Sequence, residues 1–93
     1  MQLRFHIDPA TGLPHIHEHD VTEQEVEEIL GRPLQDMRGR ENSRIAIGQT
    51  GDGRYLKVIY VPDPLPNSVF VITAYELGPK AKRAARRKKR KKR

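Results

Sequence analysis

The sequence lacks cysteine and tryptophan, and aromatic residues make up only 5% of it. Without cysteine, the chain forms neither disulfide bonds nor thiolate zinc sites. No apolar run approaches the roughly 20 residues that cross a bilayer, and Arg4, His6 and Asp8 interrupt the apolar stretch that a secretory signal peptide needs. We therefore expect a cytoplasmic protein with no membrane partner.

Acidic residues are absent after Glu76, whereas residues 80–93 contain eleven Lys or Arg. The 79 residues before them hold seven basic and twelve acidic side chains, so the net charge of +6 divides into an acidic body and a basic tail. A polycation of this density binds polyanions mainly by releasing their condensed counterions. The tail therefore predicts RNA or the ribosome as a partner. A nuclear-import signal is the alternative in a eukaryotic source.

The basic tail, residues 78–93, is too highly charged to bury apolar surface, so we expect it to be disordered, or helical only on a partner. Pro79 fits the first turn of such a helix. The tail contains no aromatic residue and therefore cannot stack on bases. Its alternatives are a solubilising segment and a segment that folds back on an acidic helix. The residues expected to contact RNA are Lys80, Lys82, Arg83, Arg86, Arg87, Lys88, Lys89 and Arg90.

Residues 1–77 predict a single α+β domain, because a chain of this length supports only one thin core. Its clearest element is a helix over 22–30. Thr22 and Glu25 form a capping box, and the apolar residues that follow repeat at helical spacing. Gly31 occupies the position where helices commonly end.

Several segments outside this helix have the composition of β-strands. We expect about four of them to form an antiparallel sheet, with one or two helices packed on one face. Two neighbouring strands join through a loop with glycines at 51 and 53, which favours a hairpin. The expected strands are 3–7, 44–50, 54–61 and 69–75, with a weaker one at 34–40.

Side-chain alternation along these strands predicts two different faces of the sheet. One face would pack under Val26, Ile29 and Leu30 of the helix, and Tyr60 would join this core. Its other members are Ile45, Ile47, Leu56, Val58, Phe70 and Ile72. The opposite, exposed face would carry Arg44, Ala46, Gly48, Tyr55, Lys57, Thr73 and Tyr75.

The exposed face has side chains suited to RNA cleavage without a metal. Attack by the neighbouring 2'-hydroxyl needs alignment, a group that takes its proton, and cations around the charge that builds on phosphorus. Arg44 and Lys57 supply positive charge, and Tyr75 or Tyr55 can stack on a base or transfer a proton. The alternative is that these are solvated surface charges.

Three histidines, His15, His17 and His19, lie between the first expected strand and the helix. Their spacing permits a metal site, a general acid or base, or a solvated polar turn. We assign no metal site to them and keep His19 as a candidate catalytic residue. The carboxylates Glu23, Glu25, Glu27 and Glu28 are expected on the exposed face of the helix.

Six short motifs of the body follow one another in a recognisable order. They are Phe5-His6-Ile7-Asp8, His19-Asp20-Val21, the capped helix 22–30, Pro33-Leu34, Arg44-Ile45-Ala46-Ile47-Gly48 and Val71-Ile72-Thr73-Ala74-Tyr75-Glu76. In element order and spacing, the chain resembles the BrnT-type toxins of the RelE/ParE-like group, and it is also similar to a neighbouring family of uncharacterised domains with the same layout.

The resemblance implies a toxin that cleaves mRNA and is held inactive by a partner antitoxin. Arg44 and His19 match family positions, and Tyr75 lies near the functional side chains of the last strand. Together with the exposed face of the sheet, the resemblance predicts an endoribonuclease that needs neither a cofactor nor a metal. Its expected catalytic residues are Arg44, Lys57, Tyr75 and His19. A non-enzymatic RNA- or ribosome-binding accessory protein of the same fold is the alternative, and a histidine metal module is a third possibility.

Overall fold

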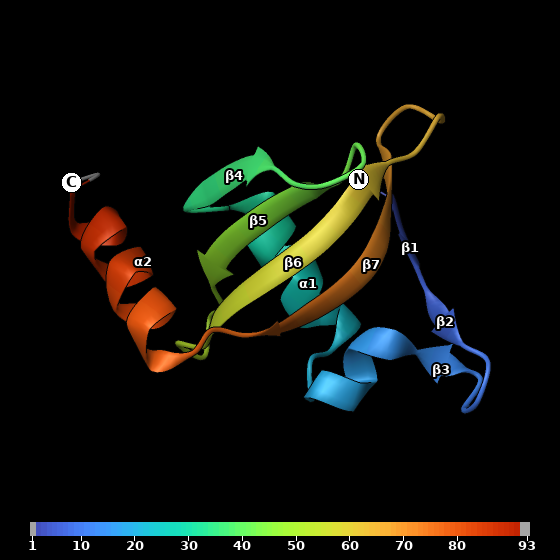
Figure 1. The fold of residues 1–93 in the computed structure, drawn as a ribbon, viewed down its shortest axis with the longest axis horizontal. Coiled ribbons are helices and arrows are strands. Elements are labelled where there is room, and N and C mark those ends of the chain that lie inside the picture. Colours follow the sequence, from blue (N-terminus) through green and yellow to red (C-terminus); the bar gives the residue numbers. More distant parts are fainter. Residues whose placement is uncertain (1, 92–93) are drawn as a thin grey trace.

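Five strands form one mixed sheet in the order β1-β7-β6-β5-β4 in the computed structural model, which describes residues 2–91 (Figure 1). A separate two-stranded sheet pairs β2 with β3. The strands are β1 Gln2–Phe5, β2 Ile7–Asp8, β3 Leu13–Pro14, β4 Gln35–Arg38, β5 Arg44–Gln49, β6 Tyr55–Pro62 and β7 Ser68–Glu76. The helices are the 3₁₀ helix η1 His15–His19, α1 Glu23–Gly31 and α2 Pro79–Lys91.

The α+β class is confirmed, but two expectations about the sheet are wrong. It has five strands instead of about four, because the segment at 34–40 does pair, as β4, with β5. It is also mixed instead of antiparallel, since β1 runs parallel to β7. These two strands are far apart in the sequence, and a local strand pattern carries no information about such a partner or its direction.

The helix expected at 22–30 is confirmed as α1, with Thr22 as its N-cap. The backbone N–H of Glu25 donates to Thr22 Oγ1 over 3.1 Å, and the N–H of Thr22 donates to Glu25 Oε1 over 3.0 Å. This is the capping box that the sequence indicates. The helix ends at Gly31, and Pro33 follows shortly after.

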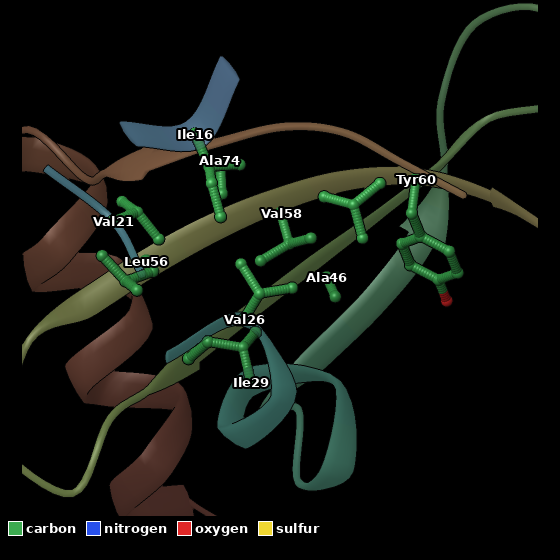
Figure 2. Packing of buried hydrophobic residues seen from close by; sticks show 10 residues of the cluster. Ile16, Val21, Val26, Ile29, Ala46, Leu56, Val58, Tyr60 and Ala74 are labelled. Atoms are coloured by element: carbon green, nitrogen blue, oxygen red, sulfur yellow. The ribbon is translucent and has the colours of Figure 1, made fainter. Parts of the chain in front are cut away.

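The main hydrophobic core lies between α1, η1 and one face of the sheet (Figure 2). Val26 and Ile29 of α1 are fully buried against Leu56 and Val58 of β6. Ile16 of η1 reaches the same core next to Ala74 of β7. Tyr60 joins it as predicted, with its hydroxyl directed away from the core (Figure 2).

The face assignment of β5 was wrong. Ala46 is fully buried in the core with Val58, its direct neighbour on β6, so Ile45 and Ile47 point to the other face. The cause is the close approach of α1: a Cβ atom added to Gly48 would lie 3.2 Å from Ile29 Cδ1. The helix therefore packs over the small residues of this strand, and the bulky ones cannot lie beneath it.

The face assignment of β7 was wrong for a different reason. A β-bulge shifts the register between Ile59 and Tyr60, so that Ile72 has no partner on β6. Val71 and Ala74, on either side of this irregularity, are the residues that enter the core. A bulge breaks the two-residue alternation from which faces are predicted.

Residues 79–91 form the helix α2, so the expectation of a disordered tail was wrong. Ala85 of α2 is buried in a second small cluster with Tyr55 and Leu77, and Leu34 and Ile47 pack against it. Tyr55 and Ile47 point to the face of the sheet opposite the α1 core, so α2 contacts that second face near the end of β5 and the start of β6. In Figure 1, α2 stands at one side of the sheet, beyond the end of β5 and the start of β6. Residues 92–93 of the predicted tail lie outside the described residues.

Among residues 2–91, no helix has the length and apolar character needed to cross a membrane.

Candidate nucleic-acid interface

Helix α2 has one side of small residues and a large basic surface. Ala81, Ala84 and Ala85 line the groove between α2 and the sheet residues Gln35 and Ile47. Lys82 is half-buried, and Arg90 lies in the helix with its side chain outside the described part of the structure. The exposed basic side chains are Lys80, Arg83, Arg86, Arg87, Lys88 and Lys89. The structure thus presents six of the eight predicted RNA-contacting residues to solvent on one helix.

Two of these basic residues also hold α2 against the sheet. The Arg86 guanidinium lies over the Tyr55 ring, 5.9 Å from its centroid, which is a cation–π geometry. Lys89 Nζ donates a hydrogen bond to Gln49 Oε1 at the end of β5. The remaining cations of α2 lie close to one another, and the first turn of this helix contains no acidic residue that would offset their charge. Like charges three and four residues apart destabilise a helix, and a polyanion relieves that repulsion.

Lys57, Tyr75 and His19 come together on the same face of the sheet as α2. Lys57 of β6 lies directly opposite Tyr75 of β7, and its Nζ is 5.7 Å from the centre of the Tyr75 ring. The His19 ring also lies near Tyr75, with the two ring centroids 5.9 Å apart. His19 reaches this position because η1 lies beside β7. Three of the four predicted catalytic residues are therefore neighbours.

Arg44, the fourth predicted catalytic residue, does not share a face with Lys57 and Tyr75. It pairs with Tyr60 across β5 and β6, and its Nε donates to Asp36 Oδ1 over 2.8 Å. The Tyr60 hydroxyl donates to the other oxygen of Asp36 over 2.6 Å. The expectation of a joint face was wrong, because the alternation of β5 is opposite to the one assumed. Arg44 instead links β5 to the edge strand β4.

This link also shifts the pKa values of its members. Hydrogen bonding and proximity to the Asp36 carboxylate raise the pKa of Arg44. Burial, followed by the hydrogen bond to Asp36, raises the pKa of Tyr60. Tyr60 therefore stays protonated as a hydrogen-bond donor, and the cluster is suited to holding β4, β5 and β6 together instead of transferring protons.

A second polar cluster joins β2 and η1; the sequence left open a metal site at His15, His17 and His19, but it did not indicate Asp8 as a partner of His15. His15 Nδ1 lies 3.8 Å from Asp8 Oδ2 and 3.5 Å from Glu18 Oε2. The backbone N–H of Ala10, and then Glu18 and His15, lower the pKa of Asp8. The rings of His6 and His19 flank that of His15, at centroid distances of 6.0 and 5.3 Å. The signal in the sequence was the pair His15 and Glu18, three residues apart, but Asp8 joins them only through the pairing of β2 with β3.

The carboxylates of α1 differ from the expectation that all four are solvated. Glu25 is only 14% exposed at its side chain and accepts from Arg54 Nη1 over 2.8 Å. Glu28 Oε1 accepts from the backbone N–H of Gly51 over 2.8 Å. Glu23 lies on the surface and contacts His17 Nε2 at 2.7 Å, which lowers the pKa of Glu23. His17 therefore pairs with Glu23 and does not belong to the cluster of Asp8, His15 and Glu18.

No protein-family model matches the sequence, and no curated protein or solved structure matches it. The resemblance to BrnT-type toxins consequently rests on the short motifs alone. Two features of the described residues bear on function: the exposed cations of α2 and the group formed by Lys57, Tyr75 and His19.

Proposed function

We propose that the protein binds RNA through the exposed cations of α2. The observation that carries the proposal is the division of this helix, in which Ala85 is buried against the sheet and six described cations remain in solvent. The contacts of Ala85 and Arg86 with Tyr55 hold the helix against the sheet. The cations then form a preorganised surface for phosphate groups, which bind with release of their counterions.

The position of α2 supports contact with a single strand of RNA. Tyr55, which carries Arg86 over its ring, lies two residues before Lys57 on the same strand and face. A strand of RNA bound along α2 can therefore continue toward Lys57 and Tyr75. There, the Tyr75 ring offers one surface on which a base can stack, and such stacking tolerates any sequence. We infer binding that depends on phosphate contacts and has little sequence preference.

The test is a salt titration of the full chain with a fluorescent single-stranded RNA, followed by anisotropy. With roughly five phosphates neutralised, the plot of log affinity against log salt has a slope of about −3.5, at about 0.7 per phosphate. A slope near zero, or no binding at 50 mM KCl, contradicts the proposal. Duplex DNA and anionic lipid vesicles are the comparison ligands, and equal affinity for the vesicles would argue against RNA as the partner.

A metal-independent endoribonuclease is the second candidate function, favoured by the proximity of both His19 and Lys57 to the Tyr75 ring. A phosphate bound beside Lys57 would have its developing charge stabilised by the ammonium group. His19 or Tyr75 would take the proton of the 2'-hydroxyl or supply one to the leaving oxygen. Arg44 has no part in this version. An antitoxin protein would be the partner that suppresses the activity, in line with the BrnT-type resemblance.

The nuclease candidate predicts that the full chain cuts RNA in EDTA and leaves cyclic phosphate ends. His19→Gln and Tyr75→Phe should each lower the cleavage rate by about 10²-fold or more, because each removes a group for proton transfer. The matched control is His17→Gln, since His17 is exposed and paired with Glu23. RNA affinity should stay within a few fold in all three variants. Unchanged cleavage in both His19→Gln and Tyr75→Phe eliminates this candidate without affecting the binding proposal.

A further inference from the structure

The cluster of Asp8, His15 and Glu18 has the geometry of a cation site. Each residue contributes one ligand atom, and these atoms lie within 4.8 Å of one another. The two distances from His15 Nδ1, 3.8 and 3.5 Å, exceed those of good hydrogen bonds. Two ligands of a tetrahedral zinc ion, each about 2.05 Å from the metal, lie about 3.3 Å apart. His15 Nδ1 thus lies near this spacing from each of the two carboxylate groups, so small side-chain movements would bring all three ligand atoms to one ion.

Electrostatics favours a cation at this point. Asp8 and Glu18 bring two acidic side chains together beside one imidazole ring, so the cluster can offer two anionic oxygens and one nitrogen to a cation. The Asp8 side chain is only 17% exposed, so solvent screens its charge incompletely. A divalent cation carries two positive charges, so it can neutralise both carboxylates while it coordinates the ring nitrogen. A proton on the imidazole adds only one positive charge.

We propose that Asp8, His15 and Glu18 bind one zinc-type divalent cation. A nitrogen ligand with two carboxylate oxygens suits Zn²⁺ and other late first-row ions, whereas Mg²⁺ prefers oxygen ligands alone. Water completes the coordination. His6 and His19, whose rings flank His15, lie close enough to orient that water or to replace it after a side-chain rotation.

The ion would add a side-chain link between two short segments that backbone hydrogen bonds already join, one of them from the His15 N–H to the His6 carbonyl oxygen over 2.9 Å. Strands β2 and β3 contain two residues each, and Ile7 and Leu13 in this hairpin are about half exposed. Asp8 belongs to this hairpin, whereas His15 and Glu18 belong to η1. Coordination therefore ties the hairpin to the helix that carries His19, and metal binding becomes part of the local stability.

The test is calorimetric titration of ZnCl₂ into the full chain in a phosphate-free buffer, compared among four proteins. The wild type should bind one ion per chain, and His15→Gln and Asp8→Asn should each weaken binding by at least tenfold. His17→Gln is the matched control, because His17 lies in the same helix but contacts Glu23. It should bind zinc as the wild type does. Circular dichroism without metal verifies that all four proteins are folded.

A second measurement separates a built site from diffuse binding by a histidine-rich surface. Zinc should slow amide hydrogen exchange in residues 7–14 of the wild type and of His17→Gln, but not in His15→Gln. Wild-type affinity in His15→Gln overturns the proposal. An equal loss of affinity in His15→Gln and His17→Gln also overturns it, since such a result indicates that any histidine of the segment serves equally well.

Discussion

Replacing Lys80, Arg83 and Arg87 together by Gln should lower the RNA affinity of the full chain by about 100-fold at 0.1 M KCl. The three residues follow one side of α2, and all are exposed. If each neutralises one phosphate, their loss removes about 0.7 unit per residue from the slope of log affinity against log salt. Gln is a good helix former, so the change removes charge without breaking the helix. Anisotropy titrations between 50 and 300 mM KCl measure both quantities.

The matched control for this experiment is Arg4→Gln, Arg38→Gln and Arg40→Gln in one chain. These residues are exposed on the body, and their replacement changes the net charge by the same amount. The control should lose less than about threefold in affinity and keep the salt slope, because screening weakens interactions between RNA and distant charges. Equal losses in the two triple variants would mean that net charge alone, and not the surface of α2, determines binding.

Glu25→Ala should destabilise the fold by about 2–3 kcal/mol at pH 7, or lower the melting temperature by about 10–15 °C. Glu25 has two functions. It closes the capping box with Thr22, and it accepts a hydrogen bond from Arg54, which also donates to the carbonyl oxygen of Asp20. Glu25→Gln should cost less, since an amide oxygen can still accept from the Thr22 N–H while the charge is lost. Glu27→Ala, on the exposed side of α1, is the control and should change little.

The pH dependence of stability provides an independent test of Glu25. Burial alone would raise its pKa, but the Thr22 N–H and the Arg54 guanidinium outweigh burial and hold the pKa below 4.5. Because the folded pKa is the lower one, this stabilisation is fully present above about pH 4.5 and disappears as the pH falls through the folded value. The difference in melting temperature between wild type and Glu25→Gln should therefore shrink between pH 5 and pH 3. A constant difference would show that charge has no part in the effect.

The reversed face of β5 changes which residues can act together. The nuclease hypothesis from the sequence combined Arg44 with Lys57 and Tyr75, yet Arg44 faces the side of α1 and is engaged by Asp36. His19, which the sequence placed only near a helix, contacts Tyr75 directly. RNA binding by α2 does not depend on which face of β5 lies under α1. It is therefore the stronger of the two functional proposals.

Local signals were sufficient for most elements of the fold. Thr22 and Glu25 predict the start of α1, because the capping box consists of contacts within one turn. The glycines at 51 and 53 similarly predict the turn between β5 and β6, in which Gly53 has a φ of +91°. Such features depend on neighbouring residues only, so the sequence contains all the information that they need.

Non-local features could not be predicted in the same way. Period-two alternation in β5 separates Ala46 from Ile45 and Ile47, but it does not say which set lies under the helix. The close approach of Ile29 to Gly48 decides this question, and that contact joins residues 19 positions apart. The same limit applies to α2, whose composition predicts disorder while the burial of Ala85 against Tyr55 and Leu77 keeps it on the sheet.

The sequence by itself determined the charge division, the types of most elements and the candidate RNA-binding residues, since these follow from composition and from interactions between near neighbours. Only the tertiary structure decided which side chains share a surface. It brought Lys57, Tyr75 and His19 together, placed Arg44 elsewhere and gathered Asp8, His15 and Glu18. The physical reason is that strand pairing and helix docking fix distances between residues that are far apart in the chain, and no local pattern encodes those distances.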